Sequence, residues 1–320
     1  MRRFLTVGDI GDLHAALAEA KEVKANPFNW QHLGKNKTII IIFFNSSLRT
    51  RLSTQKAALN MGMNPIVLNI NGDSWKLETE MGVIMDGDKT EHLREAIPVI
   101  GSYCDIIGVR SFAEFKDRKF DYEETIINQF VQYSGRPVIS LETATRHPCQ
   151  AFADLITIDE YKGQIKKPKV VLTWAPHPRA LPQAVPNSFA EWMRAAEQAG
   201  MIDFVVTNPE GYDLAPEFME GVKLERDQKK AFEGADFIYA KNWSSYEQYG
   251  QILSKDMSWT VDAEHMSWTN NAKFMHCLPV RRNMIVSDEV IDSPNSIVIP
   301  EAANRVVSAQ VVIKRMLEKL

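Results

Sequence analysis

The chain has 320 residues, of which 45% are hydrophobic and 24% are charged, and its formal net charge is −4. This length is too great for one ordinary core and fits two domains of about 150 residues each. The composition is that of a globular protein, and the net negative charge argues against a general nucleic-acid-binding protein, which usually carries a basic excess. Any site that binds an anion must therefore depend on a local cluster of positive groups rather than on the charge of the whole chain.

Cysteine usage and the N-terminal sequence bear on the compartment. Three cysteines, an odd number without metal-type pairing, indicate a reduced setting rather than a disulfide framework. The first twenty residues lack the long apolar core of a secretory signal, and no run approaches the roughly 18 apolar residues of a membrane-spanning helix. These features predict a cytoplasmic enzyme with no membrane partner.

Short β-branched runs alternate with helical patterns along the whole chain. The predicted strands are 37–44, 64–70, 104–110, 136–142, 168–174, 203–208, 235–241, 273–280 and 296–303. The predicted helices are 54–61, ending at Gly62, then 89–103, with a kink or an early end at Pro98, then 147–163, and a last one at about 303–319.

This order predicts an α/β protein with two doubly wound parallel-sheet domains linked by helices. The helix near 148–162 is the expected link, and the last helix is expected to return to the first domain. The predicted boundaries give one domain of residues 1–147 plus 303–320 and a second of residues 148–302.

Polar residues recur directly after the predicted strands. In open α/β sheets, ligands bind outside the carboxyl ends of the strands, so these positions are the informative ones. They carry several cations and hydrogen-bond donors, which together predict an anionic substrate: Arg49, Arg110, His147, Gln150, Lys241, Arg281 and Arg305.

The segment NSSLRTR, residues 45–51, follows the first long apolar run and precedes a helix. A helix N-terminus offers unpaired N–H groups and a partial positive charge, and its hydroxyl and guanidinium groups suit a small phosphate. Neither GxxxxGK[ST] nor GxGxxG is present, so a nucleotide is not indicated. Arg49 and Arg51 would point about 200° apart on a helix, so we expect Arg49 to face the phosphate and Arg51 to form a structural ion pair. A capped helix with solvated arginines remains the alternative for this segment alone.

Three motifs resemble those of the aspartate and ornithine carbamoyltransferase family. SSLRTR (46–51) resembles its carbamoyl-phosphate motif S-T-R-T-R, HPCQAFAD (147–154) matches H-P-[CST]-Q-x-x-x-D, and HCLPVRR (276–282) contains the H-C-L-P of the ornithine branch. They occur in the family's order and spacing, and the resemblance covers essentially the whole chain. It implies carbamoyl transfer from carbamoyl phosphate in arginine biosynthesis, with no cofactor.

Two departures bear on the acceptor. Leu48 replaces the middle threonine of S-T-R-T-R, a position that serves largely through its backbone N–H. Lys241, in AKNWSSYEQYG, stands near the aspartate with which ornithine enzymes hold the α-ammonium group. A lysine cannot bind an ammonium group, and WKLETEMGVIMDG and YAKNWSS look like the branch that carbamoylates N-acetylornithine or N-succinylornithine.

The resemblance also implies that the domain of residues 1–147 plus 303–320 binds carbamoyl phosphate and that the domain of residues 148–302 binds the acyl-ornithine. It implies the roles of individual residues as well. Arg110, His147, Cys277 and Arg305 would be catalytic. The donor would be held by Ser47, Leu48, Arg49, Thr50, Arg110, His147, Gln150, Leu278 and Arg305, with Trp75 reaching the site of a neighbouring subunit in a homotrimer. The acyl-ornithine would meet Thr90, Phe112, Glu142, Lys241, Cys277 and Arg281.

Alternatives remain for the acceptor and for the class of protein. Glutamate at the position of Thr90 is typical of acetyl enzymes and proline of succinyl enzymes, and threonine is neither. SLRTR and Arg281, as a partner for a second carboxylate, favour N-succinylornithine, with N-acetylornithine as the alternative. A non-catalytic small-anion-binding protein is the alternative of a different class. The close pairs His147–Cys149 and His276–Cys277 lack the wider spacing of a zinc site, so no metal is expected.

Overall fold

The computed structural model describes residues 1–70 and 72–320, which form two compact units. Unit 1 comprises Met1–Cys149 and Arg305–Leu320, and unit 2 comprises Gln150–Asn304. The predicted boundaries at 147/148 and 302/303, and the ligand assigned to each domain, stay predictions. No helix in the described part of the chain is long and apolar enough to cross a membrane.

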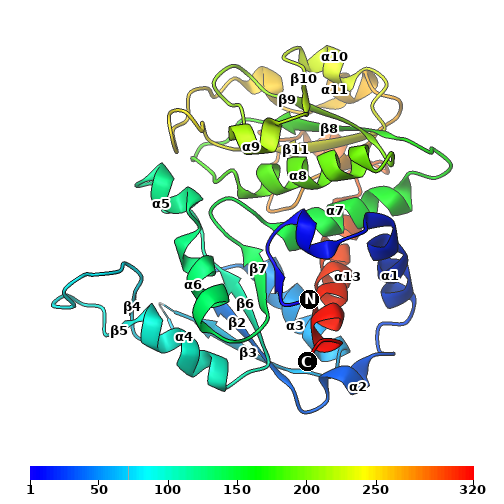
Figure 1. The fold of residues 1–320 in the computed structure, drawn as a ribbon. Coiled ribbons are helices and arrows are strands. Elements are labelled where there is room, and N and C mark those ends of the chain that lie inside the picture. The colour runs from blue at the N-terminus through cyan, green and yellow to red at the C-terminus, as the bar shows by residue number, and fades with distance from the viewer. Residues whose placement is uncertain (71) are drawn as a thin grey trace. The chain divides into compact units, whose positions relative to one another are not determined.

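Unit 1 is built on a five-stranded parallel sheet in the order β1-β7-β6-β2-β3 (Figure 1). Side chains alternate between the faces of a strand, so Ile40 and Ile42 of β2 share one face, where they join a core that includes Ile97 and Phe130. Ile39 and Ile41 are equally buried on the other face. The strands are β1 (Arg3–Phe4), β2 (Thr38–Phe43), β3 (Asn64–Asn69), β6 (Ile106–Arg110) and β7 (Val138–Glu142). Two short strands, β4 (Leu77–Glu78) and β5 (Glu91–His92), pair separately.

Helices cover both faces of this sheet, with α4 and α6 on one side and α3 and α13 on the other (Figure 1). Lys314 and Arg315 of α13 form ion pairs with Glu19 of α1, at 2.8 and 2.6 Å. The helices are η1 (Val7–Ile10), α1 (Leu13–Ala25), α2 (Gln31–Gly34), α3 (Leu48–Asn60), α4 (Leu93–Ser102), α5 (Arg118–Tyr122) and α6 (Thr125–Tyr133). The division between the units falls within α7 (Pro148–Tyr161) and α13 (Val298–Leu317).

Unit 2 has a second five-stranded parallel sheet, in the order β10-β9-β8-β11-β12. Ile238 of β11 faces a core that includes Phe232 of α10, and Tyr239 on the opposite face lies 4.1 Å from Phe189 of α8, between ring centroids. The strands are β8 (Lys169–Trp174), β9 (Asp203–Thr207), β10 (Lys223–Leu224), β11 (Phe237–Lys241) and β12 (Lys273–Met275). The helices are α8 (Ala184–Gln198), α9 (Pro216–Met219), α10 (Gln228–Phe232), η2 (Met257–Trp259), α11 (Ala263–Ser267) and α12 (Asp288–Ile291). The predicted fold class, two doubly wound parallel-sheet units, is confirmed.

The predicted strand at 296–303 is wrong. Val298–Ala303 is the start of α13, and Ser296 contributes only an isolated bridge to Phe274. Pro300 is tolerated because it lies in the first helical turn, where its missing N–H would have no intrahelical acceptor. Arg305 is therefore on a helix and does not follow a strand.

One helix boundary and one of two alternatives for another helix also differ from the prediction. The helix α3 begins at Leu48 rather than near Thr54, so residues 48–51 form its first turn. The helix α4 continues through Pro98 to Ser102, so the predicted early end at Pro98 is wrong and the kink stays a prediction. The early start of α3 matters for function because it places the polar segment at a helix N-terminus.

Candidate active site

The N-terminus of α3 presents the first polar groups of the site. Ser47 is the N-cap, and its Oγ accepts a hydrogen bond from the Thr50 N–H at 3.3 Å, which leaves the hydroxyl proton of Ser47 available for donation. Leu48 and Arg49 occupy the first two helical positions, whose N–H groups have no carbonyl acceptor within the helix. The helix therefore directs N–H groups and a partial positive charge toward one point. The Leu48 side chain is 70% exposed, which agrees with a role for its backbone alone.

Two buried arginines converge on Thr50. Arg305 Nη2, from α13, donates to Thr50 Oγ1 at 2.6 Å, and Arg110 Nη1, from the end of β6, approaches the same oxygen at 3.5 Å. All three residues are buried. One hydroxyl thus fixes two guanidinium groups that are 195 positions apart in the sequence (305 − 110).

His147 lies within this cationic cluster. Its Nε2 is 3.4 Å from Arg305 Nη2. Burial lowers the pKa of His147 well below 6.5, and the charges of Arg305, Arg110 and Arg49 lower it further. A ring that is neutral at pH 7 carries one N–H to donate and adds no further positive charge.

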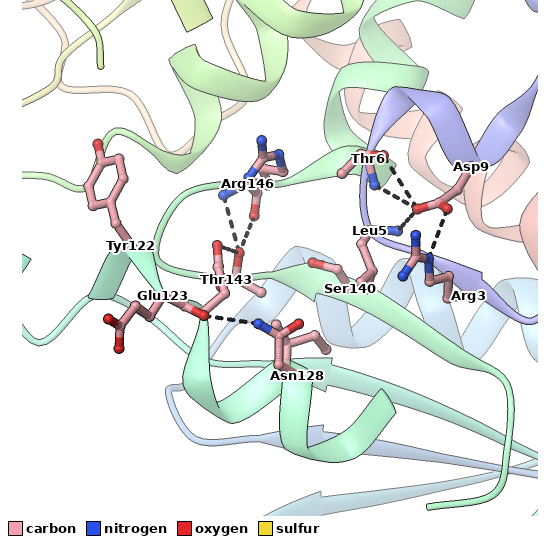
Figure 2. A pocket seen from close by; sticks show the side chains of 12 residues that line it. Arg3, Leu5, Thr6, Asp9, Tyr122, Glu123, Asn128, Ser140, Thr143 and Arg146 are labelled. Carbon is pink, nitrogen blue, oxygen red and sulfur yellow. Dashed lines mark hydrogen bonds and ion pairs between the residues drawn. The ribbon is translucent and has the colours of Figure 1, made fainter. Parts of the chain in front are cut away.

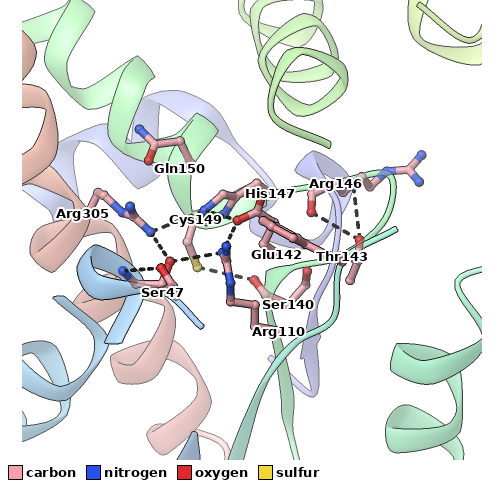
Figure 3. Close-up of polar contacts among 12 residues, drawn as sticks. Ser47, Arg110, Ser140, Glu142, Thr143, Arg146, His147, Cys149, Gln150 and Arg305 are labelled. Carbon is pink, nitrogen blue, oxygen red and sulfur yellow. Dashed lines mark hydrogen bonds and ion pairs between the residues drawn. The ribbon is translucent and has the colours of Figure 1, made fainter. Parts of the chain in front are cut away.

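Glu142, at the end of β7, is the carboxylate that enters the cluster. It pairs with Arg110 Nη1, and its Oε2 is 3.4 Å from His147 Nε2 (Figure 3). Arg110 also lies over the Phe112 ring, at 4.2 Å from the centroid, and Asn45 Oδ1 accepts from the Phe112 N–H at 2.7 Å. One carboxylate among three arginines leaves an excess of positive charge, which is the requirement for binding an anion.

The predicted residues Trp75 and Thr90 lie apart from this cluster, in the loop between β3 and β5. Trp75 is 56% exposed, and its indole N–H donates to Glu91 at 2.9 Å. The Thr90 N–H donates to Lys76 O at 3.0 Å, and Lys89 pairs with Glu78 at 2.7 Å. The loop is therefore braced by its own contacts and presents Trp75 to the surface.

The predicted ion pair of Arg51 is wrong. Arg51 is exposed, and it forms no ion pair with the residues that the structure describes. Its charge acts on Asp73, whose pKa is lowered mainly by hydrogen bonds from Asn69 and to a smaller extent by Arg51.

In unit 2, Gln150 is held by two carboxylates. Its Nε2 donates to Asp154 Oδ1 at 2.7 Å and to Glu301 Oε1 at 3.4 Å, while Glu301 Oε2 accepts from the His276 N–H at 2.9 Å. The Gln150 side-chain carbonyl oxygen is buried and accepts no hydrogen bond among the described residues. Such an oxygen can accept a hydrogen bond from an amide N–H of a ligand. The sequence reasoning missed Glu301, a fully buried acid whose only signal is a charge inside an apolar run.

Three cations of unit 2 surround His177. Its Nε2 accepts from Arg281 Nε at 3.1 Å, so the neutral ring carries its proton on Nδ1, which donates to Arg179 O at 2.9 Å. Burial lowers the pKa of His177, and the charges of Lys241, Arg281 and Arg179 lower it further. Lys241 is buried at the end of β11, whereas Arg281 is exposed. The sequence reasoning missed His177, although it follows β8 and could have been found by the rule for strand ends.

Cys277 and Leu278 follow β12 in the same unit. Cys277 is buried, and the Leu278 N–H donates to His276 Nδ1 at 2.8 Å. This bond and the Glu301 contact fix the backbone on both sides of Cys277. The roles of Cys277 and Leu278 stay predictions.

Residues 2–160 match the family model "Aspartate/ornithine carbamoyltransferase, carbamoyl-P binding domain", and residues 184–316 match the model "Aspartate/ornithine carbamoyltransferase, Asp/Orn binding domain". The chain is 70% identical to an N-succinylornithine carbamoyltransferase of Bacteroides thetaiotaomicron over 100% of both chains. It is 36% identical to an N-acetylornithine carbamoyltransferase of Xanthomonas campestris, over 95% of this chain and 94% of the relative.

A solved structure is similar over almost the whole chain. It is a point variant of N-acetyl-L-ornithine transcarbamylase complexed with carbamyl phosphate and N-succinyl-L-norvaline. Its TM-score is 0.91 at 36% identity, covering 99% of this chain and 100% of that one.

The buried neutral state of His147 predicts a loss of stability in acid. Because its pKa is lower in the folded chain than the unfolded value of about 6.5, the unfolded chain binds more protons below that pH, and stability falls as the pH falls through it. We expect His147→Asn to flatten the dependence of Tm on pH between about pH 8 and pH 5. The lowered pKa of His177 also makes stability fall in acid, so part of the dependence of Tm on pH should remain in His147→Asn. The exposed His14→Asn variant is the control, and an unchanged slope in His147→Asn would contradict the assignment.

Proposed function

Because the chain belongs to the aspartate/ornithine carbamoyltransferase family, we propose that it transfers the carbamoyl group of carbamoyl phosphate to the δ-amine of N-succinyl-L-ornithine. The products would be N-succinyl-L-citrulline and phosphate. The sequence identity of 70% to the N-succinylornithine enzyme, against 36% to the N-acetylornithine enzyme, is the observation that supports the choice of acceptor. We place the reaction in the cytoplasm.

The cluster in unit 1 supports binding of the donor. The phosphate would be held by the Ser47 hydroxyl, the first N–H groups of α3, Arg49, Arg110 and Arg305. Charged hydrogen bonds of this kind contribute about 1.5–3 kcal/mol each. A phosphate dianion would also offset the excess of positive charge that unit 1 carries in its absence.

The same cluster supports activation of the carbonyl group. As the amine attacks, the carbonyl oxygen gains negative charge, and Thr50, Arg110 and the N–H of neutral His147 would donate to it. A single donor placed before the reaction can contribute about 3–4 kcal/mol to the transition state. The carbonyl oxygen of Gln150 would accept from the carbamoyl amide, together with backbone groups of Cys277 and Leu278.

The chemistry needs a neutral amine and no covalent intermediate. An amine with a pKa of about 10.4 costs about 4–5 kcal/mol to deprotonate at pH 7. Attack forms the C–N bond, collapse of the tetrahedral species breaks the C–O bond to phosphate, and phosphate can take the proton released from nitrogen. Cys277 would help to orient the amine.

The cations of unit 2 support an acylated, doubly anionic acceptor. N-succinylornithine carries two carboxylates and no α-ammonium group, whereas N-acetylornithine carries one carboxylate. Lys241 and Arg281 would bind carboxylates, and neutral His177 holds Arg281 by accepting from its Nε. Thr90, Phe112 and Glu142 would complete the acceptor site, although Glu142 is bound to Arg110 in this structure.

The choice of acceptor is tested by steady-state assays with three acceptors side by side. We expect kcat/KM for N-succinylornithine to exceed that for N-acetylornithine by at least tenfold, and no measurable rate with free ornithine. A preference for N-acetylornithine would contradict the proposed acceptor but not the proposed carbamoyl transfer. If none of the three acceptors leads to release of phosphate from carbamoyl phosphate, carbamoyl transfer itself is contradicted.

We propose further that the protein is a homotrimer in which Trp75 serves a neighbouring subunit's site. The support is the set of large apolar side chains that unit 1 leaves exposed on α3, β3 and the following loop, because exposed apolar surface can mark a protein–protein contact. The exposed residues are Leu48, Leu52 and Leu59 of α3, Ile66 of β3, and Trp75, Met81, Val83, Ile84 and Met85 of the following loop.

Hybrid trimers test this sharing. Trp75→Ala and Arg49→Ala subunits should each form trimers of low activity. Mixed by reversible dissociation, they should regain activity, because some sites combine Arg49 of one chain with Trp75 of another. Arg49→Ala mixed with Thr50→Val is the control, since both changes fall in one chain's site. No recovery in the first mixture would contradict sharing.

A further inference from the structure

Unit 1 contains a cavity that the proposed reaction does not use. It has a volume of about 290 Å³ and lies between the N-terminal segment, the junction of α5 and α6, and the end of β7 (Figure 2). Its walls include Arg3, Leu5, Tyr122, Glu123, Ile127 and Arg146. This volume is sufficient for a molecule of amino-acid size.

A buried hydroxyl in the cavity wall lacks a partner. Ser140 is 1% exposed, and among residues 1–70 and 72–320 its Oγ forms no hydrogen bond. Ser140 is one of the residues that line the cavity. Buried polar atoms without a partner are uncommon because each costs about 1–3 kcal/mol. A ligand with a polar group at this point would satisfy the hydroxyl.

The charges around the cavity are of both signs. Arg3 and Arg146 contribute cations, while Asp9, Glu123 and Glu124 contribute acids. Asp9 is paired with Arg3 at 3.2 Å, and Glu124 accepts hydrogen bonds from Thr143 Oγ1 at 2.6 Å and from the Thr145 N–H at 3.0 Å. These acids disfavour a phosphate or another multiply charged anion, whereas a zwitterion can place a carboxylate near Arg146 and an ammonium group near Glu124. The Glu123 carboxylate is exposed and pairs with Lys119 at 3.7 Å. Leu5 and Ile127 offer contacts to an aliphatic side chain.

The cavity shares a turn with the donor cluster. The Thr143 N–H donates to Arg146 O at 2.8 Å, and Thr143 Oγ1 accepts from the Arg146 N–H at 3.2 Å, which closes the turn after β7. Thr143 and Arg146 line the cavity, while their neighbours Glu142 and His147 belong to the donor cluster (Figures 2 and 3). A ligand that moves Arg146 would therefore act on His147 through one peptide bond.

We propose that this cavity binds a free α-amino acid and that the bound amino acid changes the affinity of the donor site through the 143–146 turn. The choice of ligand rests on the proposed function, because an N-acylated product must be deacylated by a hydrolase before its α-ammonium group becomes free. A site that requires the free ammonium would respond to the later product and ignore the acylated substrate and product of the enzyme itself.

Calorimetric titration of the full chain with L-citrulline tests the proposal without any carbamoyl transfer. We expect L-citrulline to bind. N-acetyl-L-citrulline lacks the ammonium group, so any binding of it, at the acceptor site, should be unchanged by Ser140→Ala. Ser140→Ala should weaken the binding about fivefold to tenfold, which is the loss of one hydrogen bond. Ser134→Ala, at a buried serine of unit 1 outside the cavity, is the matched control and should bind as wild type does.

Titrations with carbamoyl phosphate complete the test. Saturation with L-citrulline should change the Kd of carbamoyl phosphate, and carbamoyl phosphate should change the Kd of L-citrulline by the same factor. Absence of L-citrulline binding, weaker binding of N-acetyl-L-citrulline in Ser140→Ala than in wild type, or wild-type affinity for L-citrulline in Ser140→Ala would each overturn the site. Binding without any mutual change would overturn the coupling. Failure of carbamoyl transfer alone would leave the binding result standing.

Discussion

The donor site depends on three arginines held beside one neutral histidine with a single carboxylate among them. Burying like charges together is unfavourable unless an anion or a hydrogen bond offsets each charge. Thr50 binds Arg305, Glu142 binds Arg110, and the low pKa of His147 prevents a fourth positive charge. The positive charge that these contacts do not neutralise suits a dianion. It is confined to this cluster, because the chain as a whole has a net charge of −4. Donor recognition is thus a local property of unit 1.

The parallel sheet explains why these residues can meet. The strands β2, β6 and β7 are neighbours and end at one edge, so Arg110, Glu142 and the N-terminus of α3 are brought together by topology alone. These positions could be predicted because apolar strands and the residues that follow them are visible in sequence. The strand register that pairs Arg110 with Glu142 could not be predicted, since it depends on packing between segments far apart in the chain. The same turn that carries Glu142 and His147 also borders the second cavity, so the edge of one sheet supports two sites.

The errors of sequence reasoning have physical causes. The apolar, β-branched residues 296–299 suggested a strand, yet the first turn of α13 accommodates Pro300 and buries Glu301 against the His276 N–H. A rule based on apolar runs cannot foresee a buried acid whose partners lie 25 and 151 positions away. His177 was missed for a different reason, because one histidine after a strand carries no motif. Arg51 was assigned an ion pair from helical geometry alone, which fixes a direction but not a partner.

Binding of the donor without an acceptor tests the central claim most directly. Calorimetric titration with phosphonoacetamide, an unreactive analogue of carbamoyl phosphate, should show one site per chain. Thr50→Val and Arg49→Met should each raise its Kd at least tenfold, because each removes part of the cluster in unit 1, whereas Lys241→Met in unit 2 should leave the Kd unchanged. Two results would contradict the account. One is binding of phosphonoacetamide only when the acceptor is present, and the other is an increase of its Kd in Lys241→Met as large as that in Arg49→Met.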